Sequence, residues 1–200
     1  MEQNFESLRQ EIVDKSLEAF RQGLFSGTSG NMSCRVAPDE MLITPTSVRY
    51  EALRAQDIVC MKLDGTVVEG ALQPSSEWRM HAAVYKAYGE TNAVFHTHSP
   101  YATAFAVVRR SIPAVLIEAR IFLGGDVRCA DYATPGTKEV GMNAVPALFE
   151  RGGCTLANHG VLAVGEDLAQ AYLRAEYIED VAKIYTYAKA IGEPVVLNTL

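Results

Sequence analysis

The sequence lacks the cysteine patterns of redox and zinc-knuckle proteins. Its 4 cysteines are scattered along 200 residues, and no C-x-x-C pair occurs. This excludes a zinc knuckle and a thioredoxin-like motif. A disulfide framework is not expected in a domain of this size, and scattered cysteines are typical of a reducing cytosol. We therefore expect a cytoplasmic protein.

Long apolar runs and basic runs are absent as well. The longest apolar stretches, such as AVPALF, are far too short to span a bilayer, and the N-terminal MEQNFESLRQEIVDK lacks the apolar core of a signal peptide. The net charge of −6 argues against nucleic acid or an anionic membrane as a partner. A small anionic substrate is compatible with this charge, because a local site can override the global sign.

The residues that are present suit one globular domain of α/β type. A hydrophobic share of 48% and a charged share of 21% are ordinary for such a chain, and no repeat or linker divides residues 1–200. Apolar periodicity predicts helices at 5–24, 75–88, 101–108, 137–149 and 167–191, and strands at 32–36, 41–44, 58–62, 93–97, 112–117, 128–130, 154–157 and 161–164. The Asp64-Gly65 pair predicts a hairpin. Periodicity alone does not give the strand order.

Two of the 4 histidines stand within three residues, as His96 and His98 in FHTHSP. Alternate side chains on a strand share a face, so this H-x-H pattern offers two metal ligands from one face. A catalytic zinc ion takes three or four nitrogen or oxygen ligands and leaves a position open. His159, in ANHGV, is a candidate third ligand, and Glu77, near a helix N-terminus, is a candidate fourth.

Each of these residues also has an ordinary interpretation. H-x-H pairs are common, loop histidines such as His159 often bond to the backbone, and Glu77 in a first helical turn also suits the helix dipole. His81 shares a helix face with Glu77 and is either a ligand or a packing residue beside Trp78 and Tyr85. We favour packing for His81. The metal hypothesis depends on the combination of the other four residues.

Three loops are rich in hydroxyl groups: SGTSGN at 26–31, TPTS at 44–47 and PSSE at 74–77. Each adjoins a strand or helix end. Together their backbone N–H groups, hydroxyls and a helix N-terminus are able to cradle a phosphate. Taken singly, each is an ordinary turn, and none matches a Walker loop or a G-x-G-x-x-G motif.

The segments GTSGNMS, LITPTS, PSSEWRMH, VFHTHSPYA, CADYATPGT and LANHGVLA occur in the order found in class II aldolases of the adducin-like family. The chain resembles this family over nearly its whole length, and most of all its fuculose-phosphate and deoxyribulose-phosphate branch. The resemblance implies a three-layer α/β/α fold around a mainly antiparallel sheet. It also implies a cyclic homotetramer with active sites between neighbouring subunits.

The resemblance further implies a role for each site residue. His96, His98 and His159 are the implied zinc ligands, with one ion per subunit, and Glu77 is the implied acid/base residue that also ligates the metal before substrate binds. Three imidazoles favour zinc over manganese or cobalt. The positions implied for phosphate binding are Thr28, Ser29, Gly30, Asn31, Thr46, Ser47, Ser75 and Ser76. The resemblance gives His81 no role.

The implied activity is cleavage of a ketose 1-phosphate, L-fuculose 1-phosphate or a related deoxy-ketose 1-phosphate, to dihydroxyacetone phosphate and a small aldehyde. Glu77 is expected to move the proton at C3, with a pKa raised by desolvation once it leaves the metal. A 4-epimerase, a dehydratase, a decarboxylase and a non-catalytic adducin-like assembly module are the alternatives. Epimerases usually carry Asp at the position of Glu77, and intact metal ligands argue against the assembly module.

The chain departs from the resembled family at three places. Ser47 stands where many members carry glycine, and Ile117 stands where a tyrosine is expected. The printed sequence ends at Leu200, where we expect a longer tail with a second tyrosine. These groups handle the aldehyde half of the substrate, so the sequence does not predict the aldehyde.

Overall fold

The computed structural model describes residues 5–197. The strands are β1 (Asn31–Ala37), β2 (Glu40–Ile43), β3 (Val59–Lys62), β4 (Val67–Glu69), β5 (Ala93–Thr97), β6 (Arg128–Ala130), β7 (Gly153–Leu156) and β8 (Gly160–Gly165). The helices are α1 (Phe5–Arg21), α2 (Trp78–Ala87), α3 (Pro100–Val107), α4 (Ile117–Leu123), α5 (Lys138–Leu148) and α6 (Leu168–Ile191), with a 3₁₀ turn at Ala55–Asp57. No helix in this described range is long and apolar enough to cross a membrane.

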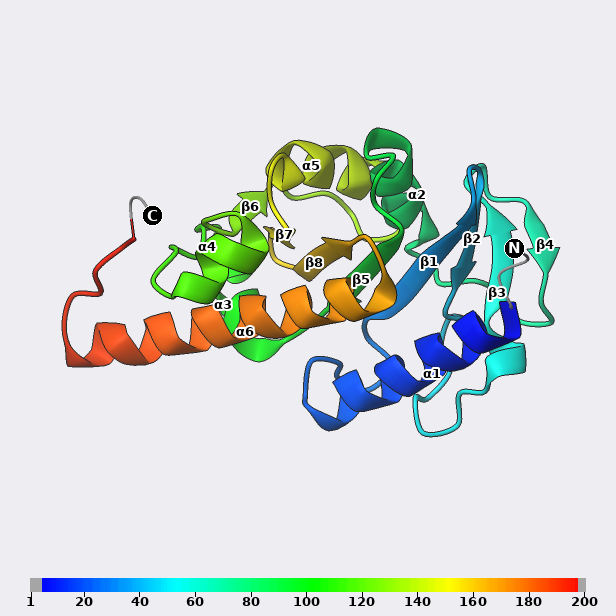
Figure 1. The fold of residues 1–200 in the computed structure, drawn as a ribbon, viewed down its shortest axis with the longest axis horizontal. Coiled ribbons are helices and arrows are strands. Elements are labelled where there is room, and N and C mark those ends of the chain that lie inside the picture. Colours follow the sequence, from blue (N-terminus) through cyan, green and yellow to red (C-terminus); the bar gives the residue numbers. More distant parts are fainter. Residues whose placement is uncertain (1–4, 198–200) are drawn as a thin grey trace.

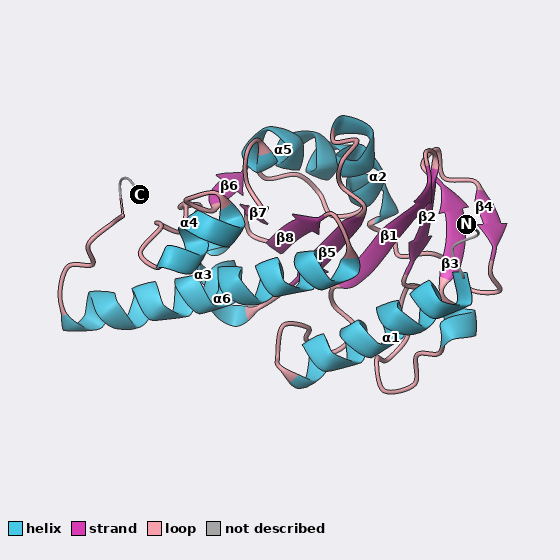
Figure 2. Cartoon of the chain, in the orientation of Figure 1, coloured by secondary structure: helices cyan, strands magenta, loops and turns pink. Residues whose placement is uncertain are grey.

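The strands form one 8-stranded sheet in the order β4-β3-β2-β1-β5-β8-β7-β6. Within residues 5–197, β6 and β7 form its one parallel pair, and the other neighbours are antiparallel. Helices α2 and α5 cover one face of the sheet, while α1, α3, α4 and α6 lie on the other (Figures 1 and 2). The predicted three-layer α/β/α fold with a mainly antiparallel sheet is confirmed.

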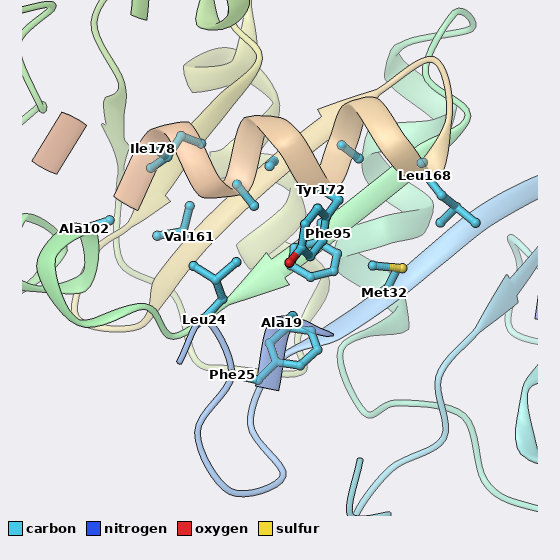
Figure 3. Close-up of a cluster of buried hydrophobic side chains, with 14 of the residues drawn as sticks. Ala19, Leu24, Phe25, Met32, Phe95, Ala102, Val161, Leu168, Tyr172 and Ile178 are labelled. Atoms are coloured by element: carbon cyan, nitrogen blue, oxygen red, sulfur yellow. The ribbon is translucent and has the colours of Figure 1, made fainter. Parts of the chain in front are cut away.

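An aromatic cluster joins the central strands to the helices on the α1/α6 side. The rings of Phe25 and Phe95 stack with centroids 5.0 Å apart, and Tyr172 of α6 meets Phe95 edge-on at 5.6 Å. Figure 3 shows Met32 and Val161, from the strands on either side of β5, in the same cluster. Burial of such large apolar surfaces stabilises this half of the protein and fixes the strand that carries His96.

On the other face, α2 and α5 pack closely against each other and against the sheet. A Cβ atom added at Gly141 of α5 lies 2.5 Å from the Ala83 Cβ atom of α2, so the approach of the two helices requires glycine at this position. Met80 and Tyr85 of α2 are buried against the strands. Helix α2 is thereby fixed over β1 and β5, with its first turn next to the end of β5 that carries the histidines.

The predicted strand at 112–117 is wrong. Ile112 makes an isolated bridge to Val127, and Ile117 is the first residue of α4, a helix that was not predicted. The segment 112–117 contains Pro113, which has no backbone N–H to donate to a neighbouring strand, and burial of Ala119 and Leu123 accompanies the helix that follows it. The Asp64-Gly65 hairpin is confirmed, because β3 pairs with β4.

The predicted helix at 75–88 begins later than expected. Its first helical residue is Trp78, so Ser75 and Ser76 lie in the preceding turn and do not cap the helix. Glu77 occupies the N-cap position, and its backbone N–H donates to the Ser75 hydroxyl at 3.3 Å. The Glu77 side chain makes no capping bond. Its carboxylate is therefore free to point into the site described next.

Candidate active site

Four side chains from three separate segments meet at one end of the central strands. His96 and His98 come from the end of β5, His159 from the turn between β7 and β8, and Glu77 from the start of α2. One possible ligand atom from each lies within 4.8 Å of those of the others. His96 is fully buried, and the other three are partly buried. The structure thus brings together the four candidate ligands and leaves His81 outside the group.

Strand pairing explains why the histidines meet. Thr97 of β5 lies opposite Val161 of β8, so the end of β5 adjoins the turn that carries His159. The turn itself is tight, because Asn158 has a φ of +55° and the His159 N–H donates to the Leu156 carbonyl at 3.0 Å. The relative positions of the three histidines are therefore fixed by the register of the β5–β8 pair.

Distances within the cluster are short. The Glu77 Oε2 atom lies 3.2 Å from His96 Nε2, and Glu77 Oε1 lies 3.1 Å from His159 Nε2. The Nε2 atoms of His96 and His98 are 3.0 Å apart. The His96 Nδ1 atom lies 2.8 Å from the Val161 carbonyl oxygen, which only accepts, so Nδ1 carries a proton. His96 Nε2 is then free to present a lone pair to the cluster.

These residues fit a divalent cation. Imidazole nitrogens and carboxylate oxygens that face each other at 3.0–3.2 Å are held together when a cation or proton is shared among them. Three imidazoles and one carboxylate form a donor set typical of zinc. The Val161 carbonyl behind His96 orients the ring in the way that outer-shell partners orient metal ligands.

The protonation of the cluster follows from its charges. Burial by itself raises the pKa of Glu77, but His96 and His159 outweigh burial and hold this pKa well below its ordinary value. Burial, followed by the neighbouring His96 and His159, lowers the pKa of His98 to about 4. The raised pKa expected for Glu77 therefore does not apply in this arrangement, since the carboxylate touches two imidazoles. It requires a state in which Glu77 has moved away from them.

Two of the hydroxyl-rich loops lie side by side next to Glu77. The Thr46 N–H donates to the Gln73 carbonyl and the Ser75 N–H donates to the Thr44 carbonyl, both at 3.0 Å. The first loop reaches the same place through Asn31, whose Nδ2 atom donates to Glu77 Oε2 at 2.9 Å. The loop sequences alone did not indicate that they would meet.

The residues predicted to bind phosphate differ in exposure, and the loop that carries Thr28 is less closely connected to the other two loops. Ser75 is buried, whereas Thr46, Ser47 and Ser76 are exposed to solvent near it. Thr28 is also exposed, in the loop closed by the bridge between Ser26 and Ser29, and no hydrogen bond among the described residues joins Thr28 to the other two loops.

Comparison with known proteins identifies the family. The profile of the Class II Aldolase and Adducin N-terminal domain matches residues 10–186. This chain belongs to the class II aldolase and adducin family. It is 41% identical to L-fuculose phosphate aldolase of Escherichia coli (strain K12) over 195 aligned residues. The aligned region covers 98% of this chain and 89% of that protein. The predictions of the family and of a metal-dependent lyase are confirmed.

Other relatives show the range of this class II aldolase family. A 5-deoxy-D-ribulose 1-phosphate aldolase of Bacillus thuringiensis serovar kurstaki is 40% identical over 190 residues, 94% of this chain and 89% of that protein. An L-ribulose-5-phosphate 4-epimerase of Salmonella paratyphi C is 33% identical over 202 residues, 94% of this chain and 87% of that protein. A solved L-fuculose 1-phosphate aldolase superposes with a TM-score of 0.91 at 41% identity, covering 96% of this chain and 90% of that one.

Ser47 of this class II aldolase has a left-handed backbone. Its φ is +62°, a region that glycine adopts without the steric cost that a Cβ atom brings. This backbone conformation suits the glycine that the resemblance leads us to expect at this position. Ile117, the other departure, lies at the start of α4 with 42% of its surface exposed.

Tyr50 is a structural element of the aldolase site that sequence reasoning missed. Its hydroxyl donates to the Gly30 carbonyl at 2.7 Å and to the Ser29 carbonyl at 3.2 Å, and the side chain is buried. Burial, followed by the charge of Glu77, raises the pKa of this phenol, so it stays a donor. Tyr50 holds the first loop in place, and no pattern in the sequence indicates this contact.

Replacing Gly160 with Ala is expected to damage the class II aldolase site. The added Cβ atom lies 2.3 Å from the Thr97 carbonyl oxygen and 3.1 Å from His98 Cδ2, so β8 has to move away from β5. We expect a loss of about 1–3 kcal/mol in the free energy of unfolding, as in overpacked cores, together with weaker metal binding. Urea unfolding and a zinc titration measure the two effects.

Gly89→Ala is the matched control, because a Cβ atom at Gly89 meets nothing within 4 Å. It is expected to leave both quantities near those of the parent. Equal stability and zinc affinity in the Gly160→Ala and Gly89→Ala proteins would contradict the close approach of β8 to the histidines.

Proposed function

We propose that this protein is a zinc-dependent class II aldolase that cleaves a ketose 1-phosphate to dihydroxyacetone phosphate and a small aldehyde. L-Fuculose 1-phosphate or a related deoxy-ketose 1-phosphate is the proposed substrate. The observation that carries the proposal is the group formed by Glu77, His96, His98 and His159, whose ligand atoms lie within 4.8 Å of one another beside hydroxyl-rich loops. Relatives named for fuculose and deoxyribulose phosphates support the substrate class.

The three histidines and Glu77 are proposed to hold the metal. When bound, zinc supplies a Lewis acid for the substrate carbonyl and for the negative charge left after cleavage. The histidines keep their place through the sheet, since His96 is fixed by the Val161 carbonyl. Glu77 is the ligand at a helix start, and it is proposed to leave the group when substrate binds.

Glu77 is proposed to move the proton at C3. In cleavage the C3–C4 electron pair stays on C3, the C4 hydroxyl loses its proton as the aldehyde forms, and the Glu77 carboxyl gives a proton to C3. In synthesis the Glu77 carboxylate removes that proton. Such proton transfer needs a group held within hydrogen-bond reach of the reacting carbon.

The loops are proposed to bind the substrate phosphate. The hydroxyls of Ser75, Ser76, Thr46 and Ser47 and the backbone N–H groups of Ser76 and Ser47 lie next to the N-terminal end of α2, where the helix dipole favours negative charge. Asn31 adds an amide donor, and Thr28, Ser29 and Gly30 belong to the loop before it. Bound phosphate orients the carbonyl end of the sugar and takes no part in bond breaking.

A cyclic homotetramer with active sites between subunits, a cytoplasmic location and the absence of nucleic-acid and membrane partners stay predictions. Large apolar side chains exposed on the described surface, among them Ile121, Phe122 and Met142, support association of subunits.

A substrate panel tests the proposed activity. L-Fuculose, rhamnulose, ribulose and 5-deoxyribulose 1-phosphates are each supplied to the protein, and dihydroxyacetone phosphate is detected with a coupled dehydrogenase. We expect release from at least one deoxy-ketose phosphate, loss of this release with a chelator, and recovery with zinc, manganese or cobalt. Absence of dihydroxyacetone phosphate with every substrate would overturn aldol cleavage, and an epimerised product in its place would favour the epimerase alternative.

A further inference from the structure

A buried chain of hydrogen bonds runs from Glu77 into the protein. Glu77 Oε2 accepts from Asn31 Nδ2 at 2.9 Å, and Asn31 Oδ1 lies 2.6 Å from His81 Nε2. His81 Nδ1 lies 2.7 Å from the Ser33 hydroxyl, which lies 2.7 Å from the Tyr85 hydroxyl. The four residues behind Glu77 are between 0% and 4% exposed. Bulk water therefore has no access to replace any of these bonds.

The two elements that build this chain have matching spacings. Asn31 and Ser33 are two apart on β1, about 6.6 Å along a strand. Glu77, His81 and Tyr85 are four apart at the start and along one face of α2, about 6 Å per step. The strand residues therefore fit between the helix residues in turn. This alternation is written in the sequence as N-x-S and E-x-x-x-H-x-x-x-Y.

The Glu77 carboxylate and the neutral His81 ring determine which atom donates in each hydrogen bond of this chain. The Glu77 carboxylate only accepts, so the Asn31 amide donates to it and must accept through Oδ1. His81 Nε2 then carries a proton. Burial lowers the pKa of His81 to about 3, so the ring is neutral and Nδ1 accepts from Ser33. The Tyr85 hydroxyl is left as the donor to Ser33.

We propose that His81 is a positioning residue that sets the orientation of the Asn31 amide. By donating to Oδ1, it keeps the Asn31 amide nitrogen, and not the amide oxygen, directed toward the Glu77 carboxylate. A freely rotating amide would also present its oxygen to the carboxylate and to an anionic substrate, which is repulsive. This inference rests on the proposed function, because it assigns Asn31 a donor role toward Glu77 and the bound phosphate sugar.

Two substitutions at His81 separate positioning from packing. His81→Leu removes the donor at similar volume, and we expect kcat and zinc affinity to fall by about 10–100-fold, as for other lost outer-shell partners. His81→Gln places an amide N–H near the position of Nε2, so it is expected to recover most of both losses. Tyr85→Phe is the matched control: it removes the far hydroxyl, leaves Ser33 able to donate, and is expected to keep the parent kcat.

A double-mutant cycle with Asn31→Ala tests whether His81 acts through Asn31. In the Asn31→Ala background, His81→Leu is expected to cause no further loss of kcat or zinc affinity. Nitrogen NMR of the chelator-treated parent protein is expected to show His81 as the neutral Nε2–H tautomer at pH 7. Folding of each variant is followed by circular dichroism and urea unfolding, and His81→Gln keeps the test decisive if His81→Leu does not fold.

Three results would overturn the positioning role: an Nδ1–H tautomer, equal kcat in a folded His81→Leu protein and the parent, or a His81→Leu penalty that persists in the Asn31→Ala background. Failure of the proposed function looks different. If the parent releases no dihydroxyacetone phosphate from any ketose phosphate, the aldolase assignment fails, while the tautomer and the zinc affinities of the His81 and Asn31 variants still decide the role of His81.

Discussion

Glu77→Gln is expected to retain zinc and to lose turnover by about 10²–10⁴-fold, the range typical of a lost general acid or base. The amide has the size of the carboxyl group and keeps one oxygen that is able to face the metal. It has no proton to give to C3 near neutral pH, and it does not accept one from dihydroxyacetone phosphate. Metal content, kcat for cleavage and the affinity for inorganic phosphate are measured on the same preparation.

Glu51→Gln serves as the charge-matched control, because this glutamate is exposed and lies outside the cluster. It is expected to leave kcat near the parent value. Near-full turnover in Glu77→Gln would show that the assigned proton transfer is wrong. A parallel loss of zinc and turnover would instead assign Glu77 to metal binding alone.

His96→Ala and His159→Ala are expected to lose zinc on dialysis and, with it, cleavage. Removal of an outer-shell partner typically weakens metal affinity by 10–100-fold, so removal of a ligand is expected to cost more than about 100-fold. His96→Ala also leaves the Val161 carbonyl, which is 2.8 Å from His96 Nδ1 in the parent, without its donor. Metal analysis after dialysis and kcat with added zinc give the two readouts.

Thermal unfolding provides a measure that does not depend on activity. Zinc that binds the folded parent protein is expected to raise its midpoint temperature of unfolding. The same zinc is expected to leave the midpoint temperatures of His96→Ala and His159→Ala unchanged. His81→Gln is the matched histidine control, and zinc is expected to raise its midpoint. Stoichiometric zinc after dialysis of either alanine variant would contradict the three-histidine site.

Sequence patterns predicted the individual candidate ligands because each stands in a short local motif, whereas the combination of the three segments came from the resemblance to the family. The H-x-H pair lies at the end of one strand, and ANHGV is a short turn, so few residues determine where the imidazoles point. The contacts between loops were less predictable. Asn31 reaches Glu77 across 46 positions and His81 across 50, and only the placement of α2 over β1 joins them.

In the fold, too, single helices were predictable from local sequence, whereas the strand order depends on contacts between distant segments. Helix α6 (Leu168–Ile191), for example, was predicted at 167–191, within one residue of its observed ends. The 112–117 segment was predicted wrongly, because its apolar residues favour a strand, whereas Pro113 lacks a backbone N–H for strand pairing and Ile112 makes an isolated bridge. The strand order of the sheet arises from pairings between distant segments, such as β1 with β5, which periodicity does not encode.

The backbone positions Glu77 and the three histidines in different ways. Glu77 lies at the start of α2, and the histidines lie at the end of β5 and in the β7–β8 turn. The histidines are attached to hydrogen-bonded strands or the turn between them, whereas the carboxylate is attached to the start of a helix and is held by side-chain contacts with Asn31, His96 and His159. A substitution at position 77 can therefore change the reacting group and leave the strands that carry the histidines in place.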